Sequence, residues 1–405
     1  MHVYKVHQKL VSNPLSDVAA EVARSLDAAG LRIPEGEIAI TAGSRGITNI
    51  DVITRATGDW LKAQGASPFI VPAMGSHNGA TADGQRNMLE SLGITEQAME
   101  MEIRACMDVV KLGSVATGDV FMDRHCFESD GVLVLNRIKL HTCFSGAVQS
   151  GLIKMMVVGM GKIKSAQTFH EAKPAEMNDM LLEMGAMILD AGKIVGGVAI
   201  LEDGNDETAE IHALQPDDIL REEPALVDRH RTYFPRLPVP ALNVLIVDQI
   251  GKTFSGTGMD TNVIAYRGVK YNEDVPEPRI RTIAALRLHP KSQGNAIGVG
   301  LADFITRELR DAIDEKKTLV NVLTTGEMMR AKIPATLDSD QELIETIQSR
   351  FGDEGWMFIP NTLHLEHLYV SEDVAKALAA NPMCDVAPTP TALDYDPQGR
   401  HTLAF

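Results

Sequence analysis

Apolar segments that end in a glycine-containing turn and lead into a helical pattern recur in the first half of the chain. Residues 38–41 are followed by Ala42-Gly43-Ser44-Arg45-Gly46, and residues 68–72 are followed shortly by Gly75-Ser76-His77-Asn78-Gly79. Strand, turn and helix in repeated succession are typical of a mostly parallel sheet covered by helices, so we predict an α/β fold. Ligands bind beyond the carboxyl ends of the strands in such sheets, which is where the two turns lie.

The alternation changes character once, near residue 231. The stretch Tyr233–Pro240 is dense in proline and indicates a linker. A chain of 405 residues is long enough for two domains at about 100–200 residues each. We predict two α/β domains with mostly parallel sheets, 1–236 and 237–405, and expect the tail from Pro382 on to pack back on the first domain. The expected helices lie at 16–29, 49–64, 81–92, 175–191, 302–315 and 340–350, and further strands at 131–136, 195–201 and 243–247.

The chain carries 38 Lys and Arg against 55 Asp and Glu, a formal net charge of −17. Nucleic acids and anionic membrane surfaces bind basic faces, so this charge argues against both as partners. The first residues lack the apolar run of a signal peptide, and no uncharged apolar stretch approaches the roughly 18 residues of a transmembrane helix. The four cysteines are scattered without a Cys-x-x-Cys pair, which fits a reducing compartment. We expect a cytoplasmic protein.

The charge is unevenly distributed along the chain. Residues 131–170 contain no Asp or Glu, although the average density gives about five (55 × 40/405) in a window of this length. Simple burial would exclude lysine as well as acids, yet the window contains five cations. The window therefore indicates an anion-binding segment, with a buried apolar segment as the alternative. The cations are Arg137, Lys139, Lys154, Lys162 and Lys164.

Four side chains in or near these segments are candidates for chemistry. Lys154 lies in an apolar run, where desolvation would lower the pKa of its amine and make it a nucleophile; a lysine extended along a surface helix is the alternative. His141, shortly after an apolar strand, and His77, in the second glycine-containing turn, are candidate catalytic groups or else residues without a ligand. His170 is a candidate metal ligand as a neutral imidazole, or a polar surface residue.

The expected second domain contains no nucleotide-binding fingerprint. Gly251-Lys252-Thr253 resembles the end of a P-loop, but Ile246 stands where that motif requires its first glycine. No Gly-x-Gly-x-x-Gly motif follows a strand. His364 and His367 have the spacing of some metal-binding pairs, but they lie in an alternating pattern that predicts a strand, where they would face opposite sides.

Together these residues resemble the nickel-dependent lactate racemase family. Lys154 and His170 are sixteen residues apart, His141 precedes the lysine, and His77 lies in a Gly-x-His turn. The resemblance covers most of the chain, including the linker. It implies two α/β domains with the active site in the cleft between them. It also implies a nickel-pincer nucleotide, a Ni(II)-pyridinium-3,5-bisthiocarboxylate mononucleotide, as the cofactor.

The resemblance assigns each role to one position. It implies that Lys154 is joined covalently to the cofactor and that His170 binds the nickel. It makes His77 and His141 the acid/base pair that acts on the hydroxyl of an α-hydroxy acid. The implied loop at the cofactor consists of Ala42, Gly43, Ser44 and Arg45, and the implied contacts to the substrate are Arg45, Gln249 and Lys252.

The implied activity is that of an isomerase, which racemises or epimerises a small anionic α-hydroxy acid by hydride transfer to and from the cofactor. Two histidines suit this reaction, because each enantiomer needs a base on its own side near neutral pH. Enzymes that make the cofactor are implied partners, and a homo-oligomer is left open. Ala42 and Asn78 depart from the family pattern, so the substrate need not be lactate. The alternatives are a metal-independent hydroxy-acid lyase or dehydratase, and a protein that binds the cofactor without turnover.

Overall fold

The computed structural model describes residues 1–44, 46–269 and 274–405, apart from the side chains of His170, Thr324 and Thr325. These residues form two compact units. The N-terminal unit is Val11–Phe234, and the C-terminal unit combines Met1–Leu10 with Pro235–Phe405. No described helix is both long enough and apolar enough to cross a membrane.

The N-terminal unit contains a five-stranded sheet in the order β3-β2-β6-β7-β8 and a separate hairpin, β4-β5. The first four strands run parallel and β8 is an antiparallel edge, so the predicted α/β fold is confirmed. The strands are β2 (Glu37–Ala42), β3 (Ser67–Pro72), β4 (Val109–Val115), β5 (Gly118–Asp123), β6 (Gly131–Arg137), β7 (Ile194–Glu202) and β8 (Thr208–Leu214). The helices are α1 (Val18–Ala29), α2 (Ile50–Ala63), α3 (Ala82–Ser91), α4 (Glu96–Met99), α5 (Arg124–Glu128), α6 (Leu152–Lys154), α7 (Lys162–Glu171), α8 (Met177–Asp190) and α9 (Ile219–Tyr233).

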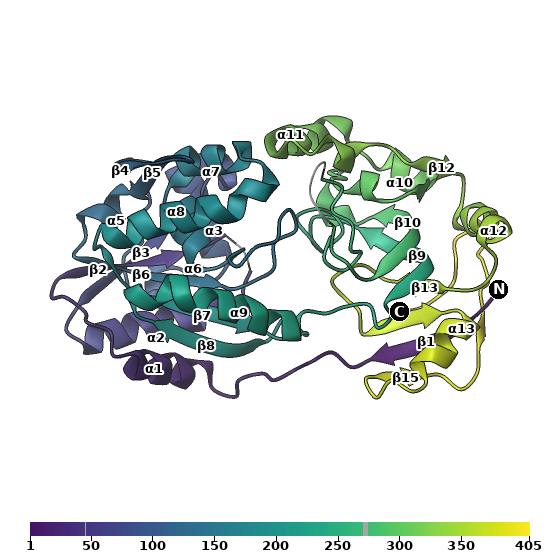
Figure 1. The fold of residues 1–405 in the computed structure, drawn as a ribbon, viewed down its shortest axis with the longest axis horizontal. Coiled ribbons are helices and arrows are strands. Elements are labelled where there is room, and N and C mark those ends of the chain that lie inside the picture. The colour runs from purple at the N-terminus through teal and green to yellow at the C-terminus, as the bar shows by residue number, and fades with distance from the viewer. Residues whose placement is uncertain (45, 270–273) are drawn as a thin grey trace. The chain divides into compact units, whose positions relative to one another are not determined.

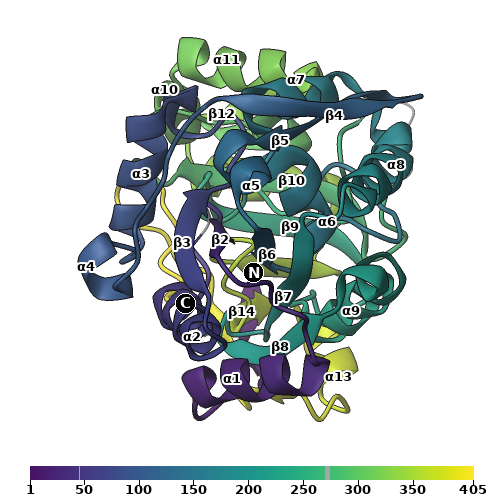
Figure 2. The ribbon, with the colours of Figure 1, turned by 90° about the vertical axis from the view of Figure 1, so that its left-hand side faces the viewer.

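Two apolar cores cover the two faces of this sheet. Val22 of α1 and Ile53 of α2 belong to one core, and Leu181 of α8 belongs to the other. Neighbouring residues of β6 serve different cores, Leu133 the first and Val134 the second, because successive side chains of a strand point to opposite faces. Figure 2 shows β3, β2, β6 and β7 in this order, with α1 and α2 on one side and α8 and α9 on the other. Burial on both faces explains why the strands are continuously apolar.

The helix expected from residue 16 begins at Val18. The carboxylate of Asp17, rather than the hydroxyl of Ser16, caps it by accepting a hydrogen bond from the backbone N–H of Ala20 at 3.0 Å. The helix ends as expected at Gly30, which adopts the left-handed conformation (φ 61°) that favours glycine.

The order of the strands creates a topological switch point between β2 and β6. The chain passes from β2 to β3 on one side and later returns to the other side of β2 as β6. The ladder between β2 and β6 ends at Ile40 and Leu133, and beyond it the hydroxyl of Thr41 accepts a hydrogen bond from the backbone N–H of Leu135 at 2.9 Å. Ligands bind at the carboxyl side of such points. The loops after β2 and β6 are the ones in which Ser44 and His141 lie.

The C-terminal unit contains one mixed sheet in the order β12-β11-β10-β9-β13-β14-β1-β15, with β16 paired to β1. Strands β12 to β13 run parallel, and β14, β1 and β15 are antiparallel to their neighbours. The strands are β1 (His2–Gln8), β9 (Ala241–Ile250), β10 (Arg279–Leu288), β11 (Phe304–Thr306), β12 (Ala335–Leu337), β13 (Trp356–Ile359), β14 (His367–Val370), β15 (Cys384–Val386) and β16 (Thr391–Ala392). The helices are α10 (Arg307–Asp311), α11 (Glu315–Thr325), α12 (Asp340–Phe351) and α13 (Glu372–Leu378).

Both ends of the chain depart from the expected domain assignment. The first residues belong to the C-terminal unit, because β1 pairs with β14 and β15; Figure 1 shows this purple strand within the yellow part of the sheet. The tail from Pro382 on, expected to pack on the first domain, belongs to the C-terminal unit. Strand β15, which lies in this tail, pairs with β1. The carbonyl of Ala404 accepts hydrogen bonds from Lys5 and Tyr369.

The helix expected over 302–315 is wrong. Residues 304–306 form β11, in which the β-branched Ile305 pairs with Ala285 of β10. Helix α10 is short, and the hydroxyl of Thr306 caps it by accepting a hydrogen bond from Leu309 N–H at 3.1 Å. Pairing with an adjacent strand overrides the helical spacing of apolar residues here.

Candidate functional site

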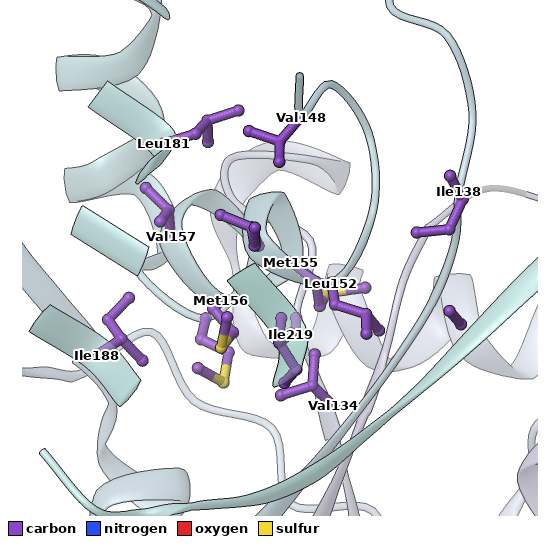
Figure 3. Packing of buried hydrophobic residues seen from close by; sticks show 14 of the residues in the cluster. Val134, Ile138, Val148, Leu152, Met155, Met156, Val157, Leu181, Ile188 and Ile219 are labelled. Atoms are coloured by element: carbon purple, nitrogen blue, oxygen red, sulfur yellow. The ribbon is translucent and has the colours of Figure 1, made fainter. Parts of the chain in front are cut away.

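Lys154 extends from a helical run that packing holds in place. Helix α6 continues into a π-helical turn over Met155–Gly159, a local irregularity that is frequent at functional sites. The Lys154 side chain is half-buried, and its ammonium lies 5.6 Å from the centre of the Phe169 ring, within range of a cation–π interaction. Figure 3 shows the buried residues of this run packed against α8 and α9: Leu152, Met155, Met156 and Val157 with Leu181, Ile188 and Ile219.

The loop after β2 lies against this run. A Cβ atom on Gly43 would stand 3.2 Å from Met155 Cε, so glycine lets the loop backbone approach the residue next to Lys154. Ala42 is buried, and its carbonyl accepts a hydrogen bond from Ala73 N–H at 2.8 Å, which joins the ends of β2 and β3. Arg45 lies outside the described residues.

The turn after β3 places His77 beside the same loop. The hydroxyl of Ser44 forms a hydrogen bond with Nδ1 of the exposed His77. Gly75 adopts φ 60°, and its N–H donates to the carbonyl of Gly159 at 3.2 Å. A Cβ atom on Gly75 would lie 3.3 Å from the carbonyl oxygen of Val158, so both the conformation and the close approach require glycine. The turn is thereby fixed to the run that carries Lys154.

His141 belongs to the loop after β6 and is connected to Lys154 by aromatic rings. Its backbone N–H donates to Oε1 of the buried Gln149 at 2.7 Å. Its ring centroid lies 4.5 Å from that of Phe144, which in turn packs edge-on against Phe169 at 6.2 Å. Phe169 is the ring beneath the Lys154 ammonium. The structure therefore gathers Ser44, His77, His141 and Lys154 around the carboxyl ends of β2, β3 and β6.

The two histidines differ in how their protons are fixed. Nδ1 of His141 accepts a hydrogen bond from the backbone N–H of Cys143 at 3.1 Å, and a backbone N–H can only donate. The neutral ring of His141 therefore carries its proton on Nε2. The partner of His77 is a hydroxyl, which can donate or accept, so His77 has access to both tautomers. In this geometry the neutral His141 can donate a hydrogen bond from Nε2, and His77 can have its lone pair on Nε2.

The predicted metal ligand, His170, is only partly covered by the described structure. His170 is the residue before the last of α7, but its side chain lies outside the described part of the structure. Within residues 1–44, 46–269 and 274–405, the side chains described include no group of three or more His, Cys, Asp or Glu that could hold a metal.

Sequence reasoning missed the network behind the His77 turn. Lys162 is fully buried, and its ammonium lies 3.0 Å from Oδ2 of Asp123. It also donates to the carbonyl of Pro72 and, at 3.3 Å, to Oε1 of Gln85. The amide of Gln85 donates to the carbonyl of Gly75 at 2.9 Å. Lys162 thus ties the end of β3 and the turn before His77 to the base of α7.

Carboxylates from other segments of the folded chain therefore neutralise part of the positive charge of residues 131–170. Lys162 pairs with Asp123 and Arg137 pairs with Glu202, and both carboxylates lie outside residues 131–170. Lys162 is buried in this network and is not available to an anionic ligand, so the predicted anion-binding segment has fewer available cations than its sequence suggests.

In the C-terminal unit, Gln249 and Lys252 lie at the carboxyl end of β9. The backbone N–H of Gln249 donates to the carbonyl of Pro360 after β13 at 2.9 Å. The ammonium of Lys252 donates to Oδ1 of Asn321 at 2.6 Å, and its backbone N–H donates to the hydroxyl of Ser292 at 3.2 Å. The two residues thus lie at the carboxyl ends of the parallel strands of their own sheet, where ligands bind in α/β proteins.

Comparisons with known proteins agree with this geometry at the level of the fold. No protein-family model matches the chain, and no curated protein matches it. Among solved structures, the lactate racemase apoprotein from Thermoanaerobacterium thermosaccharolyticum is similar at 11% identity and a TM-score of 0.57, over 88% of this chain and 94% of that one. A structural-genomics protein from Thermotoga maritima is similar at 12% identity and a TM-score of 0.53, over 87% of this chain and 98% of that one. The chain has a lactate-racemase-like fold.

One buried acid supports the central helical run of this lactate-racemase-like fold. Glu223 of α9 is fully buried, and its Oε2 accepts a hydrogen bond from the backbone N–H of Ile153 at 2.9 Å. Its Oε1 has no hydrogen-bond partner among the described residues. Burial raises the pKa of Glu223 from 4.5 to about 7, against the opposing effect of the hydrogen bonds from Ile153 and Leu152. The carboxyl group that bonds to the residue before Lys154 thus has a pKa of about 7.

We expect Glu223→Gln to raise the free energy of unfolding at pH 8 by up to about 3 kcal/mol and to change it little at pH 4. The folded-state pKa is above the unfolded one, so the protonated carboxyl stabilises fully below pH 4.5 and this stabilisation is lost as the pH rises through about 7. Glutamine keeps the acceptor without the charge. Urea unfolding at the two pH values measures the difference.

The neighbouring Glu222→Gln is the matched control, because Glu222 is half-exposed and paired with Arg221. It should show little change at either pH. An equal effect of the two substitutions at pH 8 would contradict the assignment to the buried carboxyl.

Proposed function

We propose that this chain is an isomerase that racemises or epimerises a small α-hydroxy acid. The observation that carries the proposal is the grouping of His77, His141 and Lys154 at the carboxyl ends of β2, β3 and β6 in a lactate-racemase-like fold. Two histidines and one lysine at a switch point are the groups that such a reaction needs from the protein. Ala42 and Asn78 leave the identity of the hydroxy acid open.

The residues present fit a nickel-pincer nucleotide as the cofactor. Lys154 is half-buried on a rigid run beside an aromatic ring, and the glycine at position 43 leaves the adjacent backbone uncovered. Lys154 would hold the group covalently, His170 would bind its nickel, and Ala42 to Arg45 would contact it. When bound, this group would supply a hydride acceptor and donor. The group would bring its own sulfur ligands for nickel, so the protein would need to supply only one histidine.

The chain's own residues would manage the proton and the carboxylate. His77, with its lone pair on Nε2, would take the hydroxyl proton from one enantiomer, and His141, as an imidazolium, would give its Nε2 proton to the product hydroxyl on the other side. The step would leave His77 as the imidazolium and His141 neutral, so the roles exchange for the opposite enantiomer. Because the imidazolium also carries a proton on Nδ1, protonation of His141 would break its hydrogen bond from Cys143 N–H. Arg45 would bind the substrate carboxylate with two hydrogen bonds, the geometry that a guanidinium favours. Gln249 and Lys252 are proposed as further contacts to it.

Co-expression with enzymes that make the cofactor tests the proposal. We expect the peptide that contains Lys154 to gain the mass of the cofactor, one nickel per chain, and inversion of at least one acid in a panel of chiral α-hydroxy acids. Lys154→Ala should lose all three properties. Lys164→Ala, ten residues further and exposed, should keep them.

Absence of the adduct on Lys154 in the co-expressed protein would overturn the proposal. Activity that survives chelation without an adduct would favour a metal-independent lyase or dehydratase. An adduct without turnover of any acid would favour a protein that binds the cofactor and does not catalyse.

A further inference from the structure

The sheet of the C-terminal unit has its own topological switch point, between β9 and β13. From β9 the chain builds outward through β10, β11 and β12 and then returns to the other side of β9 as β13. The loops that leave β9 and β13 at their carboxyl ends are 251–258 and 360–366. A parallel sheet binds ligands where two such loops diverge. The second loop contains Asn361 and His364, which play no part in the proposed function.

The loop after β13 fixes His364 in one tautomer. Oδ1 of Asn361 accepts hydrogen bonds from the backbone N–H groups of Leu363 and His364 at 2.9 and 2.8 Å, which sets the orientation of its amide. The amide nitrogen of Asn361 therefore donates to Nδ1 of His364 at 3.0 Å. Asn361 is buried and His364 is exposed. The ring of His364 is thus held with its proton on Nε2.

The loop after β10 fixes a second histidine in the same way. Nδ1 of His289 accepts a hydrogen bond from the backbone N–H of Lys291 at 3.3 Å, so its neutral ring also carries the proton on Nε2. Phe254 packs edge-on against both histidines, with ring centroids 5.1 Å from His289 and 6.0 Å from His364. Phe254 belongs to the loop after β9, two residues from Lys252.

Three adjacent parallel strands therefore end in donors. β13 is followed by the Nε2–H of His364, β9 by the ammonium of Lys252, and β10 by the Nε2–H of His289. Asp260 is a buried acid after the β9 loop; its backbone N–H donates to Thr362 at 2.8 Å, and its Oδ1 accepts two hydrogen bonds from Asn262. The three groups combine one positive charge with two neutral donors, a set that matches a carboxylate.

We propose that His364 and His289, with Lys252, form a binding site for the carboxylate of a small hydroxy acid at the carboxyl edge of β13, β9 and β10. The carboxylate chemistry stands on this geometry; only the choice of a hydroxy acid rests on the proposed function. Phe254 acts as a positioning residue that packs against both imidazoles. Asn361 holds the His364 ring in the tautomer that donates.

Nitrogen-15 NMR of the apoprotein with labelled histidine tests this site. The protein is made without the cofactor enzymes, and the probe is glycolate, the smallest α-hydroxy acid. We expect His289 and His364, assigned with His289→Asn and His364→Asn, to show the Nε2–H tautomer. We expect both signals to shift with glycolate in saturable fashion and with one dissociation constant. Sodium chloride at equal ionic strength should not reproduce the shifts.

Substitutions separate this site from its surroundings. Lys252→Met and His364→Asn should each weaken glycolate binding about 10-fold or more, the effect of losing a hydrogen bond to a charged group. His367→Asn is the matched control, because His367 is an exposed residue of β14 that contacts His7, and it should leave binding unchanged.

A proton on Nδ1 of either histidine, or no saturable shift of the two signals, would overturn the inference. Because the apoprotein carries no adduct, failure of the proposed function would leave a positive result standing. The two proposals therefore fail separately.

Discussion

Replacement of Lys162 by methionine is expected to lower the free energy of unfolding by about 3–5 kcal/mol. Lys162 and Asp123 are both fully buried, and their charged atoms lie 3.0 Å apart. Methionine would fill much of the volume but leave the Asp123 carboxylate as a buried charge without its cation. It would also remove the donor to the carbonyl of Pro72 at the end of β3. Urea unfolding at pH 7 measures the loss.

Two further variants show whether the effect belongs to the ion pair. Lys164→Met is the matched control, because Lys164 is exposed and its ammonium lies 5.2 Å from the centre of the Phe121 ring; it should change stability by less than about 1 kcal/mol. Adding Asp123→Asn to Lys162→Met should recover much of the loss, since it removes the unpaired charge and keeps an acceptor for Cys126 N–H. If the double variant were less stable than Lys162→Met, the unpaired charge would not be the cause.

The same pair of lysines shows what the sequence can and cannot predict. Lys154 and Lys162 lie eight residues apart in one apolar, glycine-containing stretch, and their local patterns do not distinguish them. The structure gives Lys154 a half-buried position over Phe169 and encloses Lys162 completely. The difference depends on Asp123 and Gln85, which approach only after the chain has folded. Partners from distant segments leave no local pattern.

The parallel strands of the N-terminal unit and several of its helices were predictable because their patterns are local. Each strand before a glycine-containing turn is continuously apolar, and each helix carries its apolar residues on one face, so the neighbouring sequence is enough. The prediction over 302–315 failed because a three-residue strand is determined by pairing with β10 rather than by its own pattern. The assignment of the first residues to the N-terminal domain failed for the same reason, since the strands that pair with β1 lie more than 350 residues away.

The candidate site residues likewise fall into those that a local pattern predicts and those that depend on distant segments. The loop at Gly43 and the turn at His77 follow strands, so the sequence places them at a sheet edge. His364 was interpreted as part of an alternating strand, but β14 begins only at His367. Its role depends on the return of β13 beside β9 and on Asn361, which fixes its tautomer. Strand order, rather than residue pattern, is what locates such a group.

Replacement of either catalytic candidate should slow the proposed reaction sharply. We expect His77→Gln and His141→Gln each to lower the rate of inversion by about 10²–10⁴-fold, the usual contribution of a positioned acid or base. Enantiomers have equal free energy, so each variant must slow both directions to the same extent in kcat/KM. Circular dichroism of each pure enantiomer measures the rate, and the mass of the Lys154 peptide shows whether the cofactor is still attached.

Ser44→Ala distinguishes the two histidines. The Ser44 hydroxyl bonds to Nδ1 of His77, whereas the partner of His141 Nδ1 is a backbone N–H that no side-chain substitution removes. Loss of the hydroxyl should cost about 10-fold in kcat, because His77 loses the hydrogen bond that orients its ring, and should shift the pH profile of kcat. Ser76→Ala, in the same turn but outside this hydrogen bond, should do neither.

Full activity of His141→Gln with its adduct intact would remove His141 from the mechanism and leave His77 as the single base. A single base that serves both enantiomers would have to move between the two faces of the substrate, which the hydrogen bonds of the Gly75 turn to Gly159 and Gln85 oppose.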